Sequence, residues 1–194
     1  MTIGLTGGIG SGKSTVVKLF ELLGCVIFKS DDTAKQLYFD PEIKKRVIEL
    51  LGDKAYLNEK QIDRNYIGNK IFSDPTLLEK LNAIIHPEVN SQFKIFESKN
   101  KGKILLIESA LLFEADINKQ VEKVITVISP DELRIERVMK RDGLDRNEVI
   151  SKMKTQLSQE EKARRSDFII RNNEEELMIP QVLEIYQQLN KHIN

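Results

Sequence analysis

The chain has 194 residues, of which 40% are hydrophobic and 31% charged, and its 30 basic and 30 acidic side chains cancel to a net charge of zero. This profile is typical of a soluble domain with a sizeable core, and it argues against nucleic acid or an anionic membrane surface as partner. Cys25 is the single cysteine, which excludes an internal disulfide, and no apolar run approaches the roughly 20 residues of a membrane span. We expect a cytoplasmic protein with no obligatory protein partner.

The N-terminal residues combine a short strand, a glycine-rich loop and a helix. Residues 2–6 are predicted to form a buried strand, and residues 7–14 match the pattern G-x-x-x-x-G-K-[ST]. In such a loop the backbone amides surround a phosphate, Lys13 reaches the outer phosphates and the Ser14 hydroxyl ligates Mg²⁺. Apolar residues at helical spacing follow, and Gly24 is placed to end the helix. We predict a nucleoside-triphosphate loop; the alternative is a glycine-rich turn without a ligand.

Four further apolar runs predict buried parallel strands, and polar or helical segments follow each of them. Five strands alternating with helices indicate an α/β fold with a doubly wound, five-stranded parallel sheet. About 75 residues separate the second strand from the third, which is far more than one crossover helix needs. We expect a helical insertion there, with Pro87 ending one helix and starting the next. The four strands are 25–28, 104–107, 124–128 and 168–170, and the inserted helices 41–51, 63–72, 75–85 and 87–98.

Acidic residues follow two of the predicted strands. Asp31 and Asp32 come after the second strand and Glu108 after the third, at the sheet edge where ligands bind in open α/β folds. A carboxylate there can deprotonate an attacking hydroxyl or hold the shell of a metal ion. The alternatives are that Asp31 or Asp32 caps a helix starting near Thr33, and that Glu108 only binds backbone.

A basic segment follows the fourth strand. Ser129, Pro130 and Glu132 predict a capped helix start, and residues 134–165 carry ten Lys and Arg against six Asp and Glu. A mobile basic segment could close over the γ-phosphate and stabilise its charge through Arg141; a solvated helix is the alternative. We expect Arg134 to lie at the surface.

Two features are ambiguous from the residues alone. His86 precedes Pro87 and marks either a helix boundary or a substrate contact. Asn172 follows the last strand, and its amide suits the edge of adenine, although Asn173 beside it also favours an ordinary turn.

Taken in order, these motifs resemble the dephospho-coenzyme A kinase family from residue 2 to about 173. The opening run from Ile3 to Thr15 is very close to that family's, and its Asp-Ala-Asp falls on residues 29–31. Its Pro-Leu-Leu-x-Glu segment falls within residues 108–114, and its lid glutamine is Gln156. The remaining matches are His86-Pro87, Arg141-Asp142 and the Asp-x-x-Ile-x-Asn of residues 167–172.

The resemblance implies a three-layer P-loop kinase that uses ATP and Mg²⁺ to phosphorylate the ribose 3′-hydroxyl of dephospho-coenzyme A. One domain of residues 1–194 would then comprise a nucleotide-binding core (1–32, 99–140 and 166–194), a substrate-binding insertion (33–98) and a lid (141–165). The implied catalytic residues are Asp31 as base, Lys13 and Arg141, with Ser14 and Glu108 at the metal. The nucleotide-binding set is Gly8, Gly10, Ser11, Gly12, Lys13, Ser14, Thr15 and Asn172, and the substrate-binding set is Asp31, His86, Leu111, Leu112 and Glu114.

The chain departs from the family pattern at three positions. Lys29 replaces the first Asp, which makes Asp32 a rival base; Ala110 replaces the usual proline; and Glu174 stands where glycine is common. Another small-molecule P-loop kinase, or a nucleotide-dependent switch, is the alternative function. Asn118-Lys119-Gln120-Val121 lacks the final acid of a guanine-binding motif, which disfavours a switch.

Overall fold

The computed structural model describes residues 1–191 and divides into two compact units, one of Met1–Lys29 with the chain from Asn100 onward, the other of Ser30–Lys99. The first unit holds a five-stranded sheet in the order β2-β5-β1-β6-β7, and all of its strand pairs are parallel. The five predicted strands are confirmed, each within two residues at either end. They are β1 (Thr2–Gly7), β2 (Val26–Lys29), β5 (Leu105–Glu108), β6 (Lys123–Ile128) and β7 (Phe168–Arg171).

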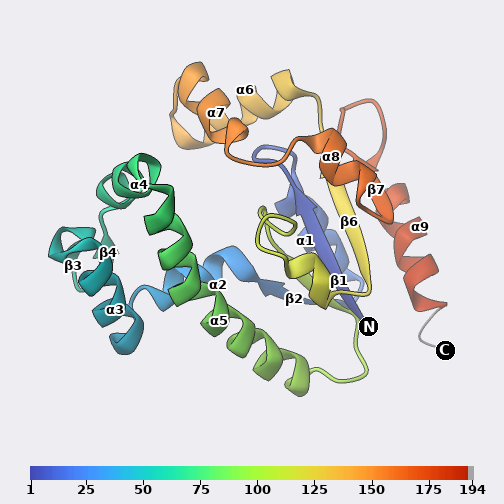
Figure 1. Ribbon diagram of the computed structural model, residues 1–194. Coiled ribbons are helices and arrows are strands. Elements are labelled where there is room, and N and C mark those ends of the chain that lie inside the picture. Colours follow the sequence, from blue (N-terminus) through green and yellow to red (C-terminus); the bar gives the residue numbers. More distant parts are fainter. Residues whose placement is uncertain (192–194) are drawn as a thin grey trace. The chain divides into compact units, whose positions relative to one another are not determined.

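Helices cover this sheet because its strands are apolar on both faces. One face is covered by α1 (Lys13–Leu22) and α9 (Met178–Asn190) (Figure 1). These helices contribute Phe20 and Ile185 to a core with Ile3, Leu5 and Ile125 of the sheet. The predicted stop of α1 is confirmed: Gly24 has φ 90°, and the amides of Gly24 and Cys25 donate to the carbonyls of Glu21 and Phe20. This is the Schellman arrangement, which needs a residue that tolerates a left-handed backbone.

The other face of the sheet is sealed by the segment after β5 and by α8 (Gln159–Arg164). Leu112, Phe113 and Val124 form a small apolar cluster, and a Cβ on Gly4 would meet the Leu112 side chain at 2.8 Å. Lys162 of α8 is completely buried; its ammonium donates to the Ala110 carbonyl and lies 3.0 Å from a carboxylate oxygen of Glu114.

Between α8 and β6 lie α6 (Asp131–Asp142) and α7 (Arg146–Lys154), and a short 3-10 helix, η2 (Ile117–Gln120), precedes β6. The predicted capping box at Ser129 is wrong. The helix begins at Asp131 without a side-chain cap, the Ser129 hydroxyl accepts from Arg137, and Glu132 pairs with Arg146 instead. A real capping box lies one helix later, where Asp145 and Glu148 bond each other's backbone amides.

The second unit consists of four helices, a 3-10 turn and a two-stranded hairpin. Buried side chains such as Leu37, Val47, Ile67 and Leu81 come from all four of the helices. The expectation of helices alone missed the antiparallel hairpin and placed the first helix too late, since it begins at Ser30. The elements are α2 (Ser30–Leu37), α3 (Pro41–Leu51), η1 (Asp53–Ala55), β3 (Tyr56–Asn58), β4 (Gln61–Ile62), α4 (Arg64–Ser73) and α5 (Pro75–Lys99).

The predicted break at Pro87 is also wrong, because α5 runs through it without interruption. A proline removes one backbone donor and leaves the carbonyl four residues earlier, here that of Ala83, without its helical partner. Both residues are on the exposed side of α5, where water can bond that carbonyl. On the buried side Leu81, Ile84, Ile85 and Val89 hold the helix, so packing outweighs the local cost.

The buried pair of Lys162 and Glu114 makes a stability prediction. Changing Lys162 to Met leaves the Glu114 carboxylate without its cation, and changing Glu114 to Gln leaves a buried ammonium without its anion. Each change is expected to lower the free energy of unfolding by about 2–4 kcal/mol. The double variant should lose at least about 1 kcal/mol less than the two single losses added together, as measured by urea unfolding. Strictly additive losses would show that the two groups do not stabilise each other.

Candidate active site

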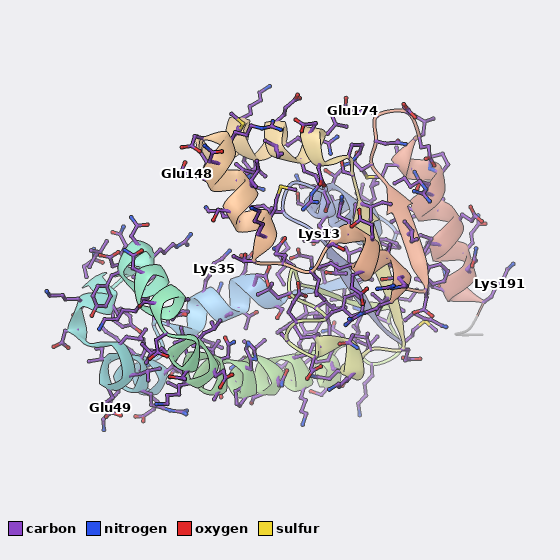
Figure 2. All side chains as sticks on the ribbon, turned by 45° about the horizontal axis from the view of Figure 1, so that its top comes forward. Lys13, Lys35, Glu49, Glu148, Glu174 and Lys191 are labelled. Atoms are coloured by element: carbon purple, nitrogen blue, oxygen red, sulfur yellow. The ribbon has the colours of Figure 1, made fainter. Side chains whose placement is uncertain are left out.

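The loop between β1 and α1 has the backbone conformation that its glycines permit. Gly10 and Gly12 have φ of 78° and 95°, in the left-handed region that side chains disfavour. The Ser11 amide donates to the Gly8 carbonyl, and the Lys13 ammonium donates to the Gly7 carbonyl at 2.9 Å. The loop therefore curls back on itself and delivers Lys13 at the N-terminus of α1 (Figure 2), the arrangement that binds phosphate groups.

Three side chains from distant parts of the chain hold this loop by its backbone. Arg134 of α6 donates to the Ile9 carbonyl at 3.0 Å, and the Ile9 amide donates to Gln156 at 2.9 Å. Asn172, after β7, donates to the Ser11 carbonyl at 2.8 Å. Both backbone groups of Ile9 are thus bonded to residues that flank α7, so the shape of the loop depends on that region of the chain.

The expectation that Arg134 lies at the surface is wrong, since it is only 5% exposed. Its guanidinium sits against the glycine loop: a Cβ on Gly8 would collide with it, and one on Gly10 would lie 2.5 Å from the Arg134 carbonyl. Burial lowers the pKa of Arg134, and Asp131, 2.8 Å away, opposes that shift. Because an arginine side chain is not deprotonated in proteins, the group stays charged at neutral pH.

A cavity of about 280 Å³ lies beside the loop, and the predicted catalytic and metal-binding residues of the first unit line it. Three of its lining residues, Lys13, Arg137 and Arg141, are cations, and Glu108 is its one acid within the part of the chain that the structure describes. A site with this balance attracts a polyanion such as a nucleotide phosphate chain. The lining residues are Gly10, Ser11, Gly12, Lys13, Ser14, Glu108, Arg137 and Arg141.

Arg137 is a lining residue that the sequence reasoning did not single out for the site. Its guanidinium donates to the Ser129 hydroxyl and to Glu174 in the loop after β7 (Figure 2), each at 3.0 Å. Arg141 lies one helical turn further along α6 and makes a two-point pair with Asp142 at 2.7 and 2.8 Å. That hydrogen bonding raises the pKa of Arg141 and lowers that of Asp142. The spacing of the arginines along α6 was the available signal for Arg137.

The oxygen donors that line the cavity fit a magnesium ion bound together with a nucleotide. Mg²⁺ is usually held by one or two protein oxygens plus water and substrate phosphates, rather than by a protein cage. The Ser14 hydroxyl and the Glu108 carboxylate are oxygen donors on this one cavity. Among the described residues no cluster of three or more His, Cys, Asp or Glu is arranged to hold a metal.

Several predicted binding residues have structural contacts of their own. The Ser11 side chain is completely buried, and its hydroxyl has no hydrogen-bond partner among residues 1–191. Leu112 is also completely buried in its apolar cluster, whereas Leu111 is 41% exposed. Glu114 accepts from the Leu157 amide at 2.9 Å besides pairing with Lys162. Ligand binding by Ser11, Leu112 and Glu114 stays a prediction.

The other predicted residues divide between the two units. Asn172 is committed to the Ser11 carbonyl, so contact with adenine stays a prediction. Asp31 lies in the first turn of α2, and Asp32 beside it is ion-paired to Lys35 at 2.8 Å, so neither caps a helix starting near Thr33. His86 is half-buried within α5, and burial lowers its pKa.

The last predicted motif, from residue 167 to 172, also ties strands together. Asp167 accepts from the Lys123 ammonium at 2.7 Å and from the Val124 amide at 2.8 Å. Burial raises the pKa of Asp167, but these bonds outweigh burial and the net shift is downward.

No helix within residues 1–191 is sufficiently long and apolar to span a bilayer.

Comparisons with known proteins agree with this fold and site. A family model described as dephospho-CoA kinase matches residues 1–177. A dephospho-CoA kinase of Bacteroides fragilis is 36% identical over 99% of this chain and 94% of its own, and one of Fusobacterium nucleatum is 37% identical over 89% and 90%. A crystal structure from Thermus thermophilus superposes with a TM-score of 0.86 at 29% identity, over 100% of this chain and 98% of its own. The dephospho-CoA kinase of Campylobacter jejuni gives 0.69 at 26% identity, over 98% of each chain.

The parallel sheet, the glycine loop and the cation-lined cavity define a P-loop kinase, and shikimate kinase from Acinetobacter baumannii shares the fold with a TM-score of 0.52. Within that class the matches above cover nearly the whole chain. The chain belongs to the dephospho-CoA kinase family.

Removing the Arg134 guanidinium should loosen the phosphate loop. Arg134→Met keeps a long side chain but frees the Ile9 carbonyl, and we expect affinity for ATP to fall about tenfold with a loss of about 1–3 kcal/mol in stability. Calorimetric titration with MgATP and urea unfolding measure the two effects. Lys140→Met, an exposed residue of the same helix, is the matched control and should change neither. Wild-type ATP affinity in Arg134→Met would contradict a role in shaping the loop.

Proposed function

We propose that this protein catalyses the ATP-dependent phosphorylation of the ribose 3′-hydroxyl of dephospho-CoA, which yields coenzyme A and completes its synthesis. The observation that carries the proposal is the match to dephospho-CoA kinases over nearly the full chain, together with a phosphate loop that retains every residue of the motif. The fold alone does not identify the acceptor, because one fold can carry enzymes that act on unrelated substrates.

The first unit supplies the nucleotide side of the reaction. The β- and γ-phosphates of ATP bind in the loop of residues 7–15, whose amides and helix N-terminus favour anions. Lys13, Arg137 and Arg141 line the same cavity and offset the negative charge that spreads over the transferred phosphoryl group. Ser14 and Glu108 would hold Mg²⁺, which when bound supplies further charge neutralisation at the phosphates.

The lid expected at residues 141–165 has a direct connection to this loop. Ile9 packs against an apolar cluster of Ile135, Val138 and Val149, and its amide is bonded to Gln156. A movement of α7 would therefore also displace Ile9. We propose that α7 and the loops beside it close over the bound nucleotide while α8 stays packed on the sheet, so that water is excluded from the transferred phosphoryl group.

Asp31 is the proposed general base that takes the proton of the ribose hydroxyl. β2 ends at Lys29, which lies opposite Glu108 in the register of the sheet, and Asp31 follows two residues later. Two residues span at most about 7 Å, so the chain itself keeps Asp31 near the carboxyl edge of the sheet. Asp32 is less suited to the role, since its carboxylate is held by Lys35.

The direct test is release of ADP from MgATP by the purified protein, with and without dephospho-CoA, and the product mass. We expect ADP release that depends on dephospho-CoA, and a product heavier by one phosphate. Nucleotide binding without acceptor-dependent turnover would overturn the proposal, and turnover of a nucleoside or sugar acid in its place would assign the chain to another reaction of this fold.

Asp31→Asn tests the base. With the carboxylate gone, turnover should fall about 10²–10⁴-fold while ATP affinity changes little, since the base acts on the acceptor. Steady-state kinetics with both substrates and calorimetric titration with MgATP separate these effects. Asp32→Asn is the matched control, with turnover within a few-fold of wild type. A larger loss in Asp32→Asn would transfer the role to that residue, and a collapse of ATP binding in Asp31→Asn would make Asp31 structural.

A further inference from the structure

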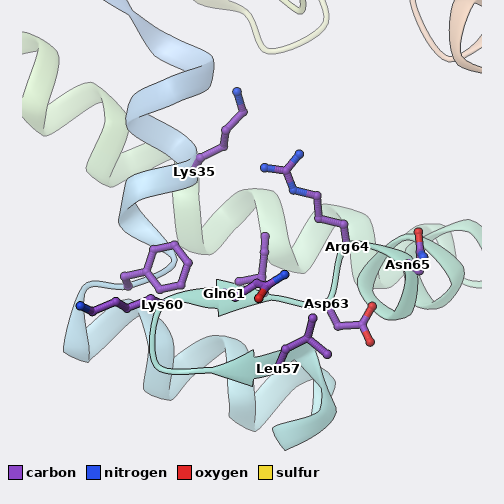
Figure 3. Close-up of a pocket in the computed structure, with 9 residues that line it drawn as sticks. Lys35, Leu57, Lys60, Gln61, Asp63, Arg64 and Asn65 are labelled. Carbon is purple, nitrogen blue, oxygen red and sulfur yellow. The ribbon is translucent and has the colours of Figure 1, made fainter. Parts of the chain in front are cut away.

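Cations line a cavity in each of the two units, but they are arranged differently. The second unit has a cavity of about 420 Å³ between the C-terminal half of α2, the β3–β4 hairpin and the start of α4 (Figure 3). Lys60 and Arg64 lie at opposite ends of its hairpin, so they do not face one common anion (Figure 3). In the first unit Arg137 and Arg141 line the cavity beside the phosphate loop, and each is paired with an acid of the chain itself.

The acid that pairs with Arg137 comes from a distant segment. Glu174 lies in the loop after β7, and its carboxylate accepts from the Arg137 guanidinium at 3.0 Å. Another N–H group of that guanidinium donates to the Ser129 hydroxyl. Glu174 is not a lining residue of the cavity, so it acts on the cavity through Arg137. Part of the positive charge that Arg137 brings to the phosphate site is therefore compensated within the protein.

The backbone of Glu174 has a conformation that favours glycine. Its φ is 67°, in the left-handed region where a Cβ is disfavoured. The turn around it is held by another side chain, since Asn173 accepts from the amides of Glu175 and Glu176. The chain thus carries a charged side chain at a cost in backbone strain, and that side chain is bonded to an arginine of the cavity.

We propose that Glu174 is a positioning residue that lowers the affinity of the site for its nucleotide, because it holds the Arg137 guanidinium and offsets its charge. Nucleotide phosphates and the Glu174 carboxylate are both anions that bind arginine, so a nucleotide gains less from Arg137 while Glu174 is paired with it. A kinase must also release ADP, and a built-in counter-anion shortens the time for which ADP stays bound.

The inference rests on the proposed function for the identity of the nucleotide, ATP. The opposite case is a direct hydrogen bond from the nucleotide to the Glu174 carboxylate. The two cases differ in sign, because removal of the carboxylate strengthens nucleotide binding in the first and weakens it in the second.

Three variants of the full chain test the inference. Glu174→Gln removes the charge but keeps a side chain on the left-handed backbone, whereas Glu174→Gly removes both. Each should bind MgATP and ADP about threefold more tightly than wild type in calorimetric titration without acceptor. The KM for ATP should fall by the same factor, with the KM for dephospho-CoA unchanged. Glu175→Gln, an exposed neighbour without an ion pair among residues 1–191, is the matched control and should behave as wild type.

Salt gives a readout that a merely structural role would not change. The difference in MgATP affinity between Glu174→Gln and wild type should shrink as KCl is raised, because screening weakens the attraction between the phosphates and the released arginine. A difference that persists at high salt would contradict a role for charge.

The remaining outcomes are decisive as well. Unchanged or weaker MgATP binding in Glu174→Gln would overturn the inference. Tighter binding in Glu174→Gly alone would assign the effect to backbone strain, and an equal gain in Glu175→Gln would assign it to general surface charge; either result overturns the inference. Because the titration omits the acceptor, a failure to turn over dephospho-CoA would count against the proposed function and leave this inference standing.

Discussion

The hydrogen bonds that fix Ile9 and Ser11 are the constraint on which the nucleotide side of this protein depends. A glycine loop gains its anion site by giving up local rigidity, because glycine loses more conformational freedom on folding than any other residue. Here the lost rigidity is restored from outside the loop, by Arg134, Gln156 and Asn172. The loop is thus held by α6, the segment after α7 and the segment after β7.

The same bonds explain why charge is buried beneath a site that must bind anions. The Arg134 guanidinium donates to a backbone carbonyl and pairs with Asp131, so its charge is compensated inside the fold. Arg137 and Arg141, on the same helix, instead line the cavity. One amphipathic helix therefore supplies both the support of the loop and the cations that face the phosphates, with roles set by helical position alone.

Much of the fold could be predicted from the sequence because its signals are local. Apolar runs marked all five strands, and Gly24 marked the end of α1. The errors arose where tertiary contacts outweigh local preference. Pro87 predicts a helix boundary from its own chemistry, but the apolar side of α5 carries the helix through it. Arg134 is charged and so predicts exposure, yet its guanidinium is bonded to the Ile9 carbonyl of the distant phosphate loop and to Asp131 at the start of its own helix.

The candidate site shows the same division. The phosphate loop could be identified because its function depends on consecutive residues, whereas Arg137 enters the cavity only through the packing of α6 against the loop. The cavity of the second unit left no sequence signal, since its hairpin was not predicted and its cations are spread over three elements. A site for a conserved chemical group such as phosphate can be carried by a short motif. Selection among acceptors requires a surface assembled from several elements, and such a surface is visible only after folding.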